Sequence, residues 1–112
     1  MNIAVMTSGG DAPGMNAAIR AVVRTSIYKG MEVYGIYGGF EGLIDGKLEK
    51  LNLSSVADII QKGGTILGTS RSKRFQSEEG QESAVSKLKI YNIDKLVVLG
   101  GDGSAKGALA LE

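Results

Sequence analysis

The sequence predicts an α/β domain: a parallel sheet wound by helices on both faces, in a Rossmann-like arrangement of three layers. Short apolar runs alternate with segments of helical apolar spacing, beginning with residues 3–7 and 15–28. Glycine clusters follow several of these runs, and glycine makes up 17 of 112 residues, about twice its ordinary share. The composition is globular rather than disordered, with 43% hydrophobic and 22% charged residues.

The first strand–helix unit is the clearest. Residues 3–7 (IAVMT) form a short apolar run that predicts a buried strand. Residues 8–14 then form a tight loop with three glycines and a proline. A helix is expected over residues 15–28, because its apolar positions keep the spacing of one buried face. Gly30 is a stop signal just after it.

The middle of the chain predicts shorter elements. Residues 31–37 are typical of a second strand, and residues 38–42 of a glycine-rich turn. A short strand is expected at residues 47–51. Ser54 or Ser55 can cap a helix that runs to about residue 61. Residues 63–68 are either strand-like or a turn between glycines.

The last third alternates again. Residues 70–80 form a polar loop, residues 82–91 a helix and residues 94–99 a buried parallel-type strand. Residues 100–104 form the loop after that strand. A helix is expected from residue 105 and meets no stop signal by residue 112. We therefore expect the N-terminal portion of a larger, truncated domain, with a short final helix as the alternative. The strand at 94–99 would then end the sheet on an uncovered edge.

Two absent residue types exclude several chemistries. The sequence has no histidine and no cysteine, so a histidine base, a Ser-His-Asp triad, thiolate nucleophiles, disulfides and His- or Cys-based zinc sites are excluded within it. The net charge of +1 argues against a broad nucleic-acid or membrane field. The sequence shows no secretory signal at its start and no apolar run long enough to cross a membrane, so a cytoplasmic location is expected.

Two glycine–acid loops are candidates for ligand binding. The loops at residues 8–14 and 100–104 each follow an apolar strand and precede a predicted helix, which is where open α/β sheets bind ligands. The first helix N-terminus is suited to a phosphate. Asp102, between Gly101 and Gly103, suits Mg²⁺ held beside substrate phosphates. Neither loop matches the Walker or dinucleotide fingerprint. Tight turns without a ligand remain the alternative for both.

Basic residues offer weaker signals. Residues 70–74 (SRSKR) place three cations in five positions, where arginine suits a phosphate, although a solvated basic loop explains the same pattern. Arg20 and Arg24 share one face of the first predicted helix, where a solvated face is again the alternative.

Three sequence blocks together resemble the ATP-dependent 6-phosphofructokinase family, most closely its bacterial members. The blocks are TSGGDAPGMNAAIR at residues 7–20, GGTILGTSR at residues 63–71 and GGDGS at residues 100–104. The resemblance covers the whole chain and corresponds to the first third of the family's catalytic subunit. It implies that residues 1–112 are the N-terminal part of an ATP-binding domain.

The resemblance implies an activity and a set of site residues. The family is a glycolytic kinase that transfers the γ-phosphoryl group of MgATP to the 1-hydroxyl of fructose 6-phosphate. Gly10 would donate its backbone N–H at the β- and γ-phosphates, and Arg71 would clamp the transferring phosphoryl group; both count as catalytic. The expected nucleotide contacts are Gly10, Arg71, Ser72, Gly101, Asp102, Gly103 and Ser104, with Asp102 facing Mg²⁺.

Two positions bear on the choice of donor. Phe40 stands where bacterial members commonly carry a tyrosine near the adenine, and its ring keeps an apolar face. Pyrophosphate-dependent relatives tend to carry aspartate at the position of Gly103. Because a carboxylate there would repel the α-phosphate of ATP, glycine favours ATP as the donor.

The resemblance also implies regulation and assembly. Bacterial members are homotetramers with an effector site between subunits, where ADP or phosphoenolpyruvate could act. The matching positions are Arg20, Ala21, Val22, Val23, Arg24 and Asp58. Leu53 departs from the pattern, because well-studied bacterial members carry an arginine there.

Two other functions use similar loops. NAD kinases and diacylglycerol-type lipid kinases also carry a G-G-D-G-[ST] loop, but they lack the block at residues 9–20. A noncatalytic nucleotide-sensing α/β module could bind ATP without transferring phosphate. The catalytic base of the resembled family lies in a segment beyond residue 112, so the chain alone is expected to be inactive.

Overall fold

The computed structural model describes residues 1–8, 14–57, 59, 65–69, 76–100 and 107–110. These residues form a five-stranded sheet with strand order β3-β2-β1-β4-β5, flanked by helices. The elements, in chain order, are β1 (Asn2–Ser8), α1 (Met15–Tyr28), β2 (Glu32–Ile36), α2 (Gly39–Asp45), β3 (Leu48–Leu51), the 3₁₀ helix η1 (Leu53–Val56), α3 (Glu78–Ile90), β4 (Lys95–Gly100) and β5 (Gly107–Ala110).

The centre of the sheet is parallel and its two edges are antiparallel. β1 pairs in parallel with β2 on one side and with β4 on the other. β3 runs antiparallel to β2, and β5 runs antiparallel to β4. The predicted α/β fold is confirmed, with the difference that the edge strands reverse direction. The connection between β2 and β3 passes through the short helix α2 and returns the chain beside β2.

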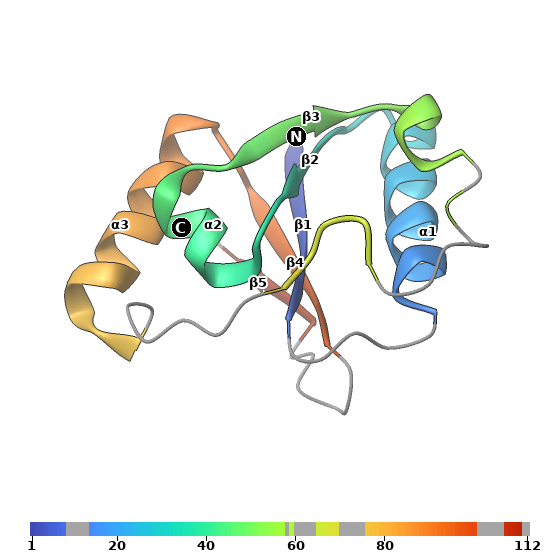
Figure 1. Ribbon diagram of the computed structural model, residues 1–112. Coiled ribbons are helices and arrows are strands. Elements are labelled where there is room, and N and C mark those ends of the chain that lie inside the picture. The colour runs from blue at the N-terminus through green and yellow to red at the C-terminus, as the bar shows by residue number, and fades with distance from the viewer. Residues whose placement is uncertain (9–13, 58, 60–64, 70–75, 101–106, 111–112) are drawn as a thin grey trace.

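Helices cover both faces of the sheet, as predicted (Figure 1). Alternation along β1 assigns its side chains to two cores. Ile3 and Val5 pack with Ile19 and Val23 of α1 on one face. Ala4 and Met6 point to the other face and pack with residues of α2 and α3. β1 is thus buried from both sides, which explains its unbroken apolar sequence.

Most predicted elements are confirmed within one or two residues. The bounds of α1 match the prediction, and Gly30 takes a positive φ of 79° just after it. The strands β1, β2, β3 and β4 also lie where expected. α3 begins at Glu78, four residues earlier than predicted. Ser77 caps it by accepting a hydrogen bond from the Gly80 N–H at 3.0 Å, and the acidic residues Glu78 and Glu79 favour the helix N-terminus.

The prediction of a glycine-rich turn at residues 38–42 is wrong, because α2 occupies most of these residues. Gly38 and Gly46 bracket this helix in left-handed conformations with φ of 85° and 80°. Gly42 lies inside the helix, where a Cβ atom would collide with the carbonyl oxygen of Tyr37. The absence of a side chain at Gly42 permits a close approach of two backbone segments and does not mark a turn.

The prediction of a helix from Ser54 or Ser55 to residue 61 is also wrong within the described residues. The chain forms only the short 3₁₀ helix η1, and Ala57 is already extended with φ −66° and ψ 138°. Asn52, rather than either serine, is its N-cap. The Asn52 side chain accepts from the Ser55 N–H at 3.0 Å, and the Ser55 hydroxyl accepts from the Asn52 N–H at 3.1 Å. Residues 58 and 60–64 lie outside the described part.

The helix expected from residue 105 is contradicted where the structure describes that segment. Residues 107–110 form β5, whose backbone pairs Gly107 with Val98 and Ala110 with Lys95. The edge of β4 that was expected to be uncovered therefore has a partner. An open strand edge offers a ladder of backbone hydrogen bonds, and that gain outweighs the small helix preference of an alanine-rich segment.

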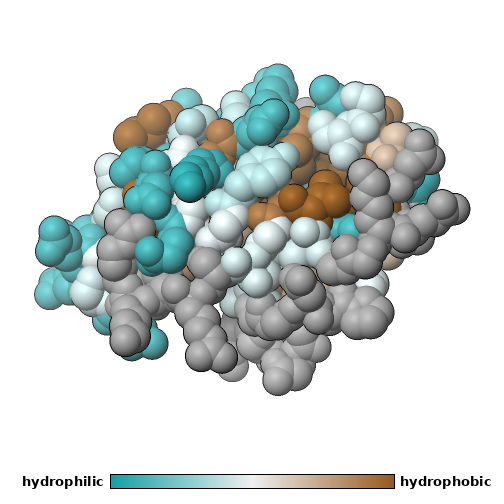
Figure 2. Space-filling view, in the orientation of Figure 1, coloured by the Kyte–Doolittle hydropathy of each residue, from teal (hydrophilic) through white to brown (hydrophobic). Residues whose placement is uncertain are grey.

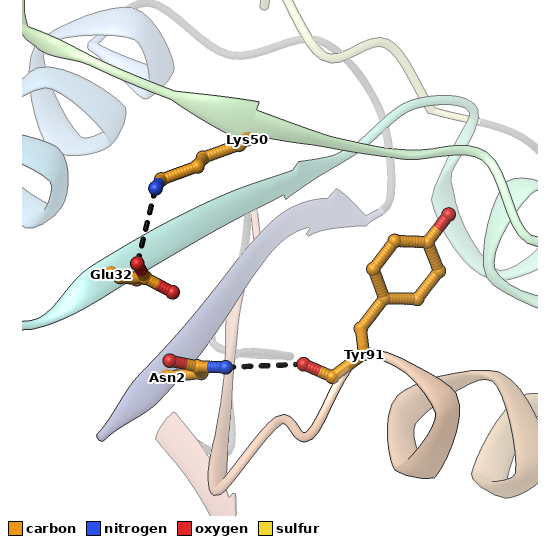
Figure 3. A network of polar contacts seen from close by, with 4 residues as sticks. All are labelled: Asn2, Glu32, Lys50 and Tyr91. Carbon is orange, nitrogen blue, oxygen red and sulfur yellow. Dashed lines mark hydrogen bonds and ion pairs between the residues drawn. The ribbon is translucent and has the colours of Figure 1, made fainter.

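The amino-terminal ends of the parallel strands are closed by polar contacts (Figure 3). The Asn2 side chain donates to the Tyr91 carbonyl at 3.2 Å, and the Asn2 N–H donates to the Asp94 carboxylate at 2.8 Å. Lys50 and Glu32 form an exposed ion pair at 3.1 Å across β3 and β2. These contacts tie loops and strands together, and the segments predicted to bind ligands follow the opposite, carboxyl ends of β1 and β4 in the sequence. No helix in the described part of the chain is long and apolar enough to cross a membrane.

Candidate functional site

The two predicted phosphate loops depart from neighbouring positions on the sheet. Ser8 is the last residue of β1 and Gly100 is the last residue of β4, and the strand register pairs them directly. Each is followed by one glycine–acid loop of the sequence. Because both strands are parallel, their carboxyl ends meet at one edge of the sheet, where open α/β sheets bind ligands.

The block at residues 63–71 reaches the same end of the sheet through Thr7. The Thr7 hydroxyl lies 2.7 Å from the Gly68 carbonyl oxygen and 3.1 Å from the Thr65 hydroxyl. Thr7 is fully buried one residue before the end of β1. These two contacts join positions about sixty residues apart and bring residues 65–68 beside the start of the first loop.

Asn16 makes a second connection to this segment. It is buried in the first turn of α1. Its side-chain nitrogen donates to the Ile59 carbonyl at 3.2 Å, and its side-chain oxygen accepts from the Ile66 N–H at 2.7 Å. The amide group thereby joins two backbone positions on either side of the Gly63-Gly64 pair.

A backbone hydrogen bond holds the start of α2 near the carboxyl ends of these strands. The Gly38 N–H donates to the Leu67 carbonyl at 2.9 Å, immediately before α2 begins. Phe40, expected near the adenine, lies in the first turn of α2, is half-buried and packs against the core shared with α3. Residues 65–69 cross the middle of the face seen in Figure 1. Figure 2 shows the same face, and apolar surface lies in its middle.

The N-terminus of α1 follows the first predicted phosphate loop in the sequence. Its N-cap is Gly14, which takes a left-handed φ of 93° and has no side chain to cap the first turn. The first turn also carries no acidic residue. The positive end of the helix dipole therefore favours an anion at this position.

Electrostatic shifts near this edge are modest. Burial raises the pKa of the Tyr37 phenol above its ordinary value of 10.0, and the Glu49 carboxylate raises it further. Tyr37 directly follows β2 and its ring packs against the core beneath α1. Its phenol is therefore neutral at physiological pH and cannot act as a base there.

The predicted ligand contacts themselves lie mostly outside the described residues. This holds for Gly10, Asp58, Arg71, Ser72, Gly101, Asp102, Gly103 and Ser104. The described residues place the segments that lead to these positions. No cluster of three acidic or histidine side chains that could hold a metal occurs in the part of the chain that the structure describes. Asp102 thus remains the predicted magnesium ligand.

The predicted effector residues of α1 are described, and they differ in exposure. Arg24 and Ala21 are exposed, Arg20 and Val22 are half-buried, and Val23 is fully buried in the core. Arg24 lines a shallow hollow of about 260 Å³ with Thr25, Tyr28 and Lys29. The side chain of Val23 faces the sheet, so an effector could touch only its backbone. η1 packs against α1, and Leu53 at its start is 53% exposed.

Sequence reasoning assigned no role to Thr7 or Asn16. A signal was present in both cases, because each is a polar residue inside an apolar pattern. Thr7 ends the apolar strand, on the same face as Ile3 and Val5, and Asn16 adjoins buried Met15 in the apolar stripe of α1. Buried polar side chains require partners, so such positions predict a structural link.

Comparisons with known proteins agree on one family. The family model described as phosphofructokinase matches residues 2–112. Two bacterial proteins named ATP-dependent 6-phosphofructokinase are each 61% identical to the chain, from Oceanobacillus iheyensis over 109 residues and from Natranaerobius thermophilus over 106. These alignments cover 97% and 95% of this chain but only 34% and 33% of the relatives. The chain therefore spans about a third of their length.

Solved structures support the same fold. A phosphofructokinase structure from Saccharomyces cerevisiae matches with a TM-score of 0.88 and 52% identity, covering 92% of this chain and 14% of that one. A pyrophosphate-dependent phosphofructokinase from Marinobacter aquaeolei matches with a TM-score of 0.73 at 21% identity, covering 89% of this chain and 26% of that one. At this low identity the second match supports the fold alone.

Proposed function

Because this chain belongs to the phosphofructokinase family, we propose that it forms the nucleotide-binding part of an ATP-dependent 6-phosphofructokinase. The complete enzyme transfers the γ-phosphoryl group of ATP to the 1-hydroxyl of fructose 6-phosphate, a kinase reaction of glycolysis. One observation of the structure is the main support for the proposal. The pairing of Ser8 with Gly100 starts both glycine–acid loops side by side, and the Thr7–Gly68 bond brings the described part of the block at residues 63–71 to the same end of the sheet.

The loops would bind the phosphates mainly through backbone groups. Gly10 would donate its backbone N–H to the β- and γ-phosphates, and the helix dipole at the start of α1 would favour their charge. Gly101, Gly103 and Ser104 would contact the nucleotide from the neighbouring loop, and Ser72 would contact it beside Arg71. Arg71 would bind oxygens of the transferring group, where a fixed cation favours the charge that spreads over those oxygens in the transition state.

Magnesium fits the donor chemistry at this edge. Asp102 is a single carboxylate between two glycines, two residues after the end of β4, and Mg²⁺ in such sites takes one or two carboxylates together with substrate phosphates. The ion, when bound, neutralises charge on the phosphates. Asp102 would hold it, and the flanking glycines leave room for the phosphates beside the carboxylate.

ATP is the favoured donor for a steric and an electrostatic reason. Gly103 adds neither bulk nor charge where the α-phosphate would lie. Phe40 stands on α2 next to the Gly38–Leu67 bond, at the edge where the loops begin, and offers an apolar ring for the adenine.

Effector control would use the exposed side of α1. Arg24 is exposed there, and in a cytoplasmic homotetramer it would bind ADP or phosphoenolpyruvate together with Arg20 and Asp58. Leu53 lies on η1, which packs against α1, and it offers no charge to a phosphate. We therefore propose weak ADP activation.

A coupled assay tests the proposal on the complete polypeptide that contains residues 1–112. We expect ADP formation that requires both Mg²⁺ and fructose 6-phosphate, with little turnover when pyrophosphate replaces ATP. The 112-residue chain alone is the comparison sample, for which we expect no sugar-dependent turnover. ATP binding by the complete polypeptide without any sugar-dependent turnover would contradict the kinase proposal and favour a nucleotide-sensing module.

A further inference from the structure

We propose that Thr7 and Asn16 are positioning residues for phosphoryl transfer, because they bind Ile59 and residues 65–68 to the carboxyl end of β1 and the first turn of α1. Gly68 precedes Arg71 by three positions, so the position of Gly68 limits where Arg71 can lie. This inference rests on the proposed function, which assigns Arg71 to the transferring phosphoryl group. Together, Thr7 and Asn16 form what we call the clasp.

The hydrogen bonds of Thr7 have a defined direction. A carbonyl oxygen only accepts, so the Thr7 hydroxyl donates its one proton to Gly68 at 2.7 Å. The 3.1 Å contact with Thr65 then requires the Thr65 hydroxyl to donate to Thr7. Thr65 in turn accepts from the Leu67 N–H at 3.2 Å. Thr7 thus anchors a chain of hydrogen bonds that fixes the backbone of four consecutive residues, from Thr65 to Gly68.

Asn16 contributes a bond of each kind. Its amide donates to the Ile59 carbonyl and accepts from the Ile66 N–H, so one side chain holds both residues beside the first turn of α1. An aspartate of the same shape can accept from Ile66 but cannot donate to Ile59 when ionised. A leucine could do neither. The clasp therefore depends on the chemistry of these side chains and not only on their volume.

Core packing alone does not explain a hydroxyl at position 7. Thr7 follows Ile3 and Val5 on one face of β1, and valine has the same shape as threonine and would fill the space equally well. The hydroxyl serves only the links to residues 65–68 that the structure describes. The remaining described backbone link is the bond from Gly38 to Leu67. In Figure 1 the segment crosses the carboxyl end of β1 at the point of these contacts.

The test compares two substitutions at one position in the complete polypeptide. Thr7→Val removes the hydroxyl and keeps the shape, whereas Thr7→Ser keeps the hydroxyl. We expect Thr7→Val to lower kcat by at least about tenfold, because a misplaced catalytic group loses rate steeply. The KM for fructose 6-phosphate should change by less than about threefold. Thr7→Ser should retain kcat within about threefold of the unsubstituted protein.

A control and a coupling measurement separate positioning from stability. Ser26→Ala removes a buried hydroxyl near the other end of α1, beside Ile3 and Met31, and should leave kcat unchanged whatever it does to the melting temperature. If the clasp acts through Arg71, Thr7→Val should cost less than about twofold in kcat when Arg71 is already alanine, because coupled positions are not additive.

The possible outcomes are distinct. If Thr7→Val lowers the melting temperature but leaves kcat within about twofold, the hydroxyl only stabilises the fold and the inference is overturned. An equal loss of kcat in the Arg71→Ala background would also overturn it. If Thr7→Val does not fold, Asn16→Asp is measured in the same two backgrounds and must show the same dependence on Arg71. Absence of sugar-dependent turnover in the unsubstituted protein would contradict the proposed function itself, and the inference would fall with it.

Discussion

Replacing Gly42 by alanine should destabilise the fold, although alanine is the better helix former. In an exposed helix the exchange would stabilise by about 1 kcal/mol. Here the new Cβ atom would collide with the carbonyl oxygen of Tyr37 and lie 2.7 Å from its carbonyl carbon, and neither is a side-chain atom that could rotate away. α2 would have to move relative to the end of β2.

The magnitude follows from what that movement breaks. The Lys47 N–H donates to Gly42 at 2.8 Å, and the Tyr37 N–H donates to Lys47 at 3.0 Å. Losing these two bonds costs about 2 kcal/mol, at roughly 1 kcal/mol each. Overpacking adds about 1–3 kcal/mol. After the helix preference is subtracted, Gly42→Ala should lower the free energy of unfolding by about 2–4 kcal/mol.

Urea unfolding followed by far-ultraviolet circular dichroism measures this directly. Gly30→Ala is the matched control, because no described atom lies within 4 Å of its added Cβ and only its left-handed φ of 79° is strained. That strain costs about 1–2 kcal/mol. With an m-value of about 1–3 kcal/mol/M, the Gly42→Ala midpoint should fall by about 1 M or more. If Gly42→Ala loses no more stability than Gly30→Ala, the steric reasoning is refuted.

Four further outcomes follow from the proposed site and from the edge of β2, the first three in the complete polypeptide. Arg71→Ala should lower kcat by at least about 10²-fold, and unchanged steady-state kinetics would return this residue to a solvated loop. Gly103→Asp should reduce kcat/KM for ATP far more than for pyrophosphate; an ATP value within about twofold of the original contradicts the steric argument. Leu53→Arg should strengthen ADP activation by about tenfold through one charge-assisted contact, and strong activation without the substitution would show that other residues suffice. Because the folded state raises the pKa of Tyr37, its contribution to stability should be complete below pH 10 and lost as the pH rises through the raised value. Glu49→Gln should lower that pKa while burial keeps it above 10.0, and ¹³C NMR of the labelled tyrosines would record both; an unchanged value would exclude the carboxylate as a cause.

The sequence pattern was sufficient where burial decides the structure. β1 is an unbroken apolar run and α1 has strong apolar periodicity, and both lie where predicted because β1 is packed in both cores and α1 in one. It failed where one residue type serves two purposes. Gly42 resembles a turn residue in sequence, but its role is close backbone contact inside α2. Residues 107–110 favour a helix by local propensity, and pairing with β4 overrides that preference.

The same division holds for the site. That the loops after Ser8 and Gly100 begin side by side could be predicted, since parallel neighbouring strands end at one edge. The links from Thr7 and Asn16 to residues 59–68 could not, because hydrogen bonds between positions far apart in sequence leave no periodic signal. Only the polar character of two residues in apolar surroundings indicated that partners must exist.

The most direct test of the site is a crystal structure of the complete polypeptide with Mg²⁺ and a non-hydrolysable ATP analogue. The account predicts that the triphosphate lies between the loops that follow Ser8 and Gly100, with Arg71 on its terminal phosphate and the ion at Asp102. The Thr7–Gly68 and Asn16–Ile66 bonds should be present in the same crystal. A nucleotide bound only in the hollow beside Arg24 and Tyr28, with the strand ends free of phosphate, would contradict it.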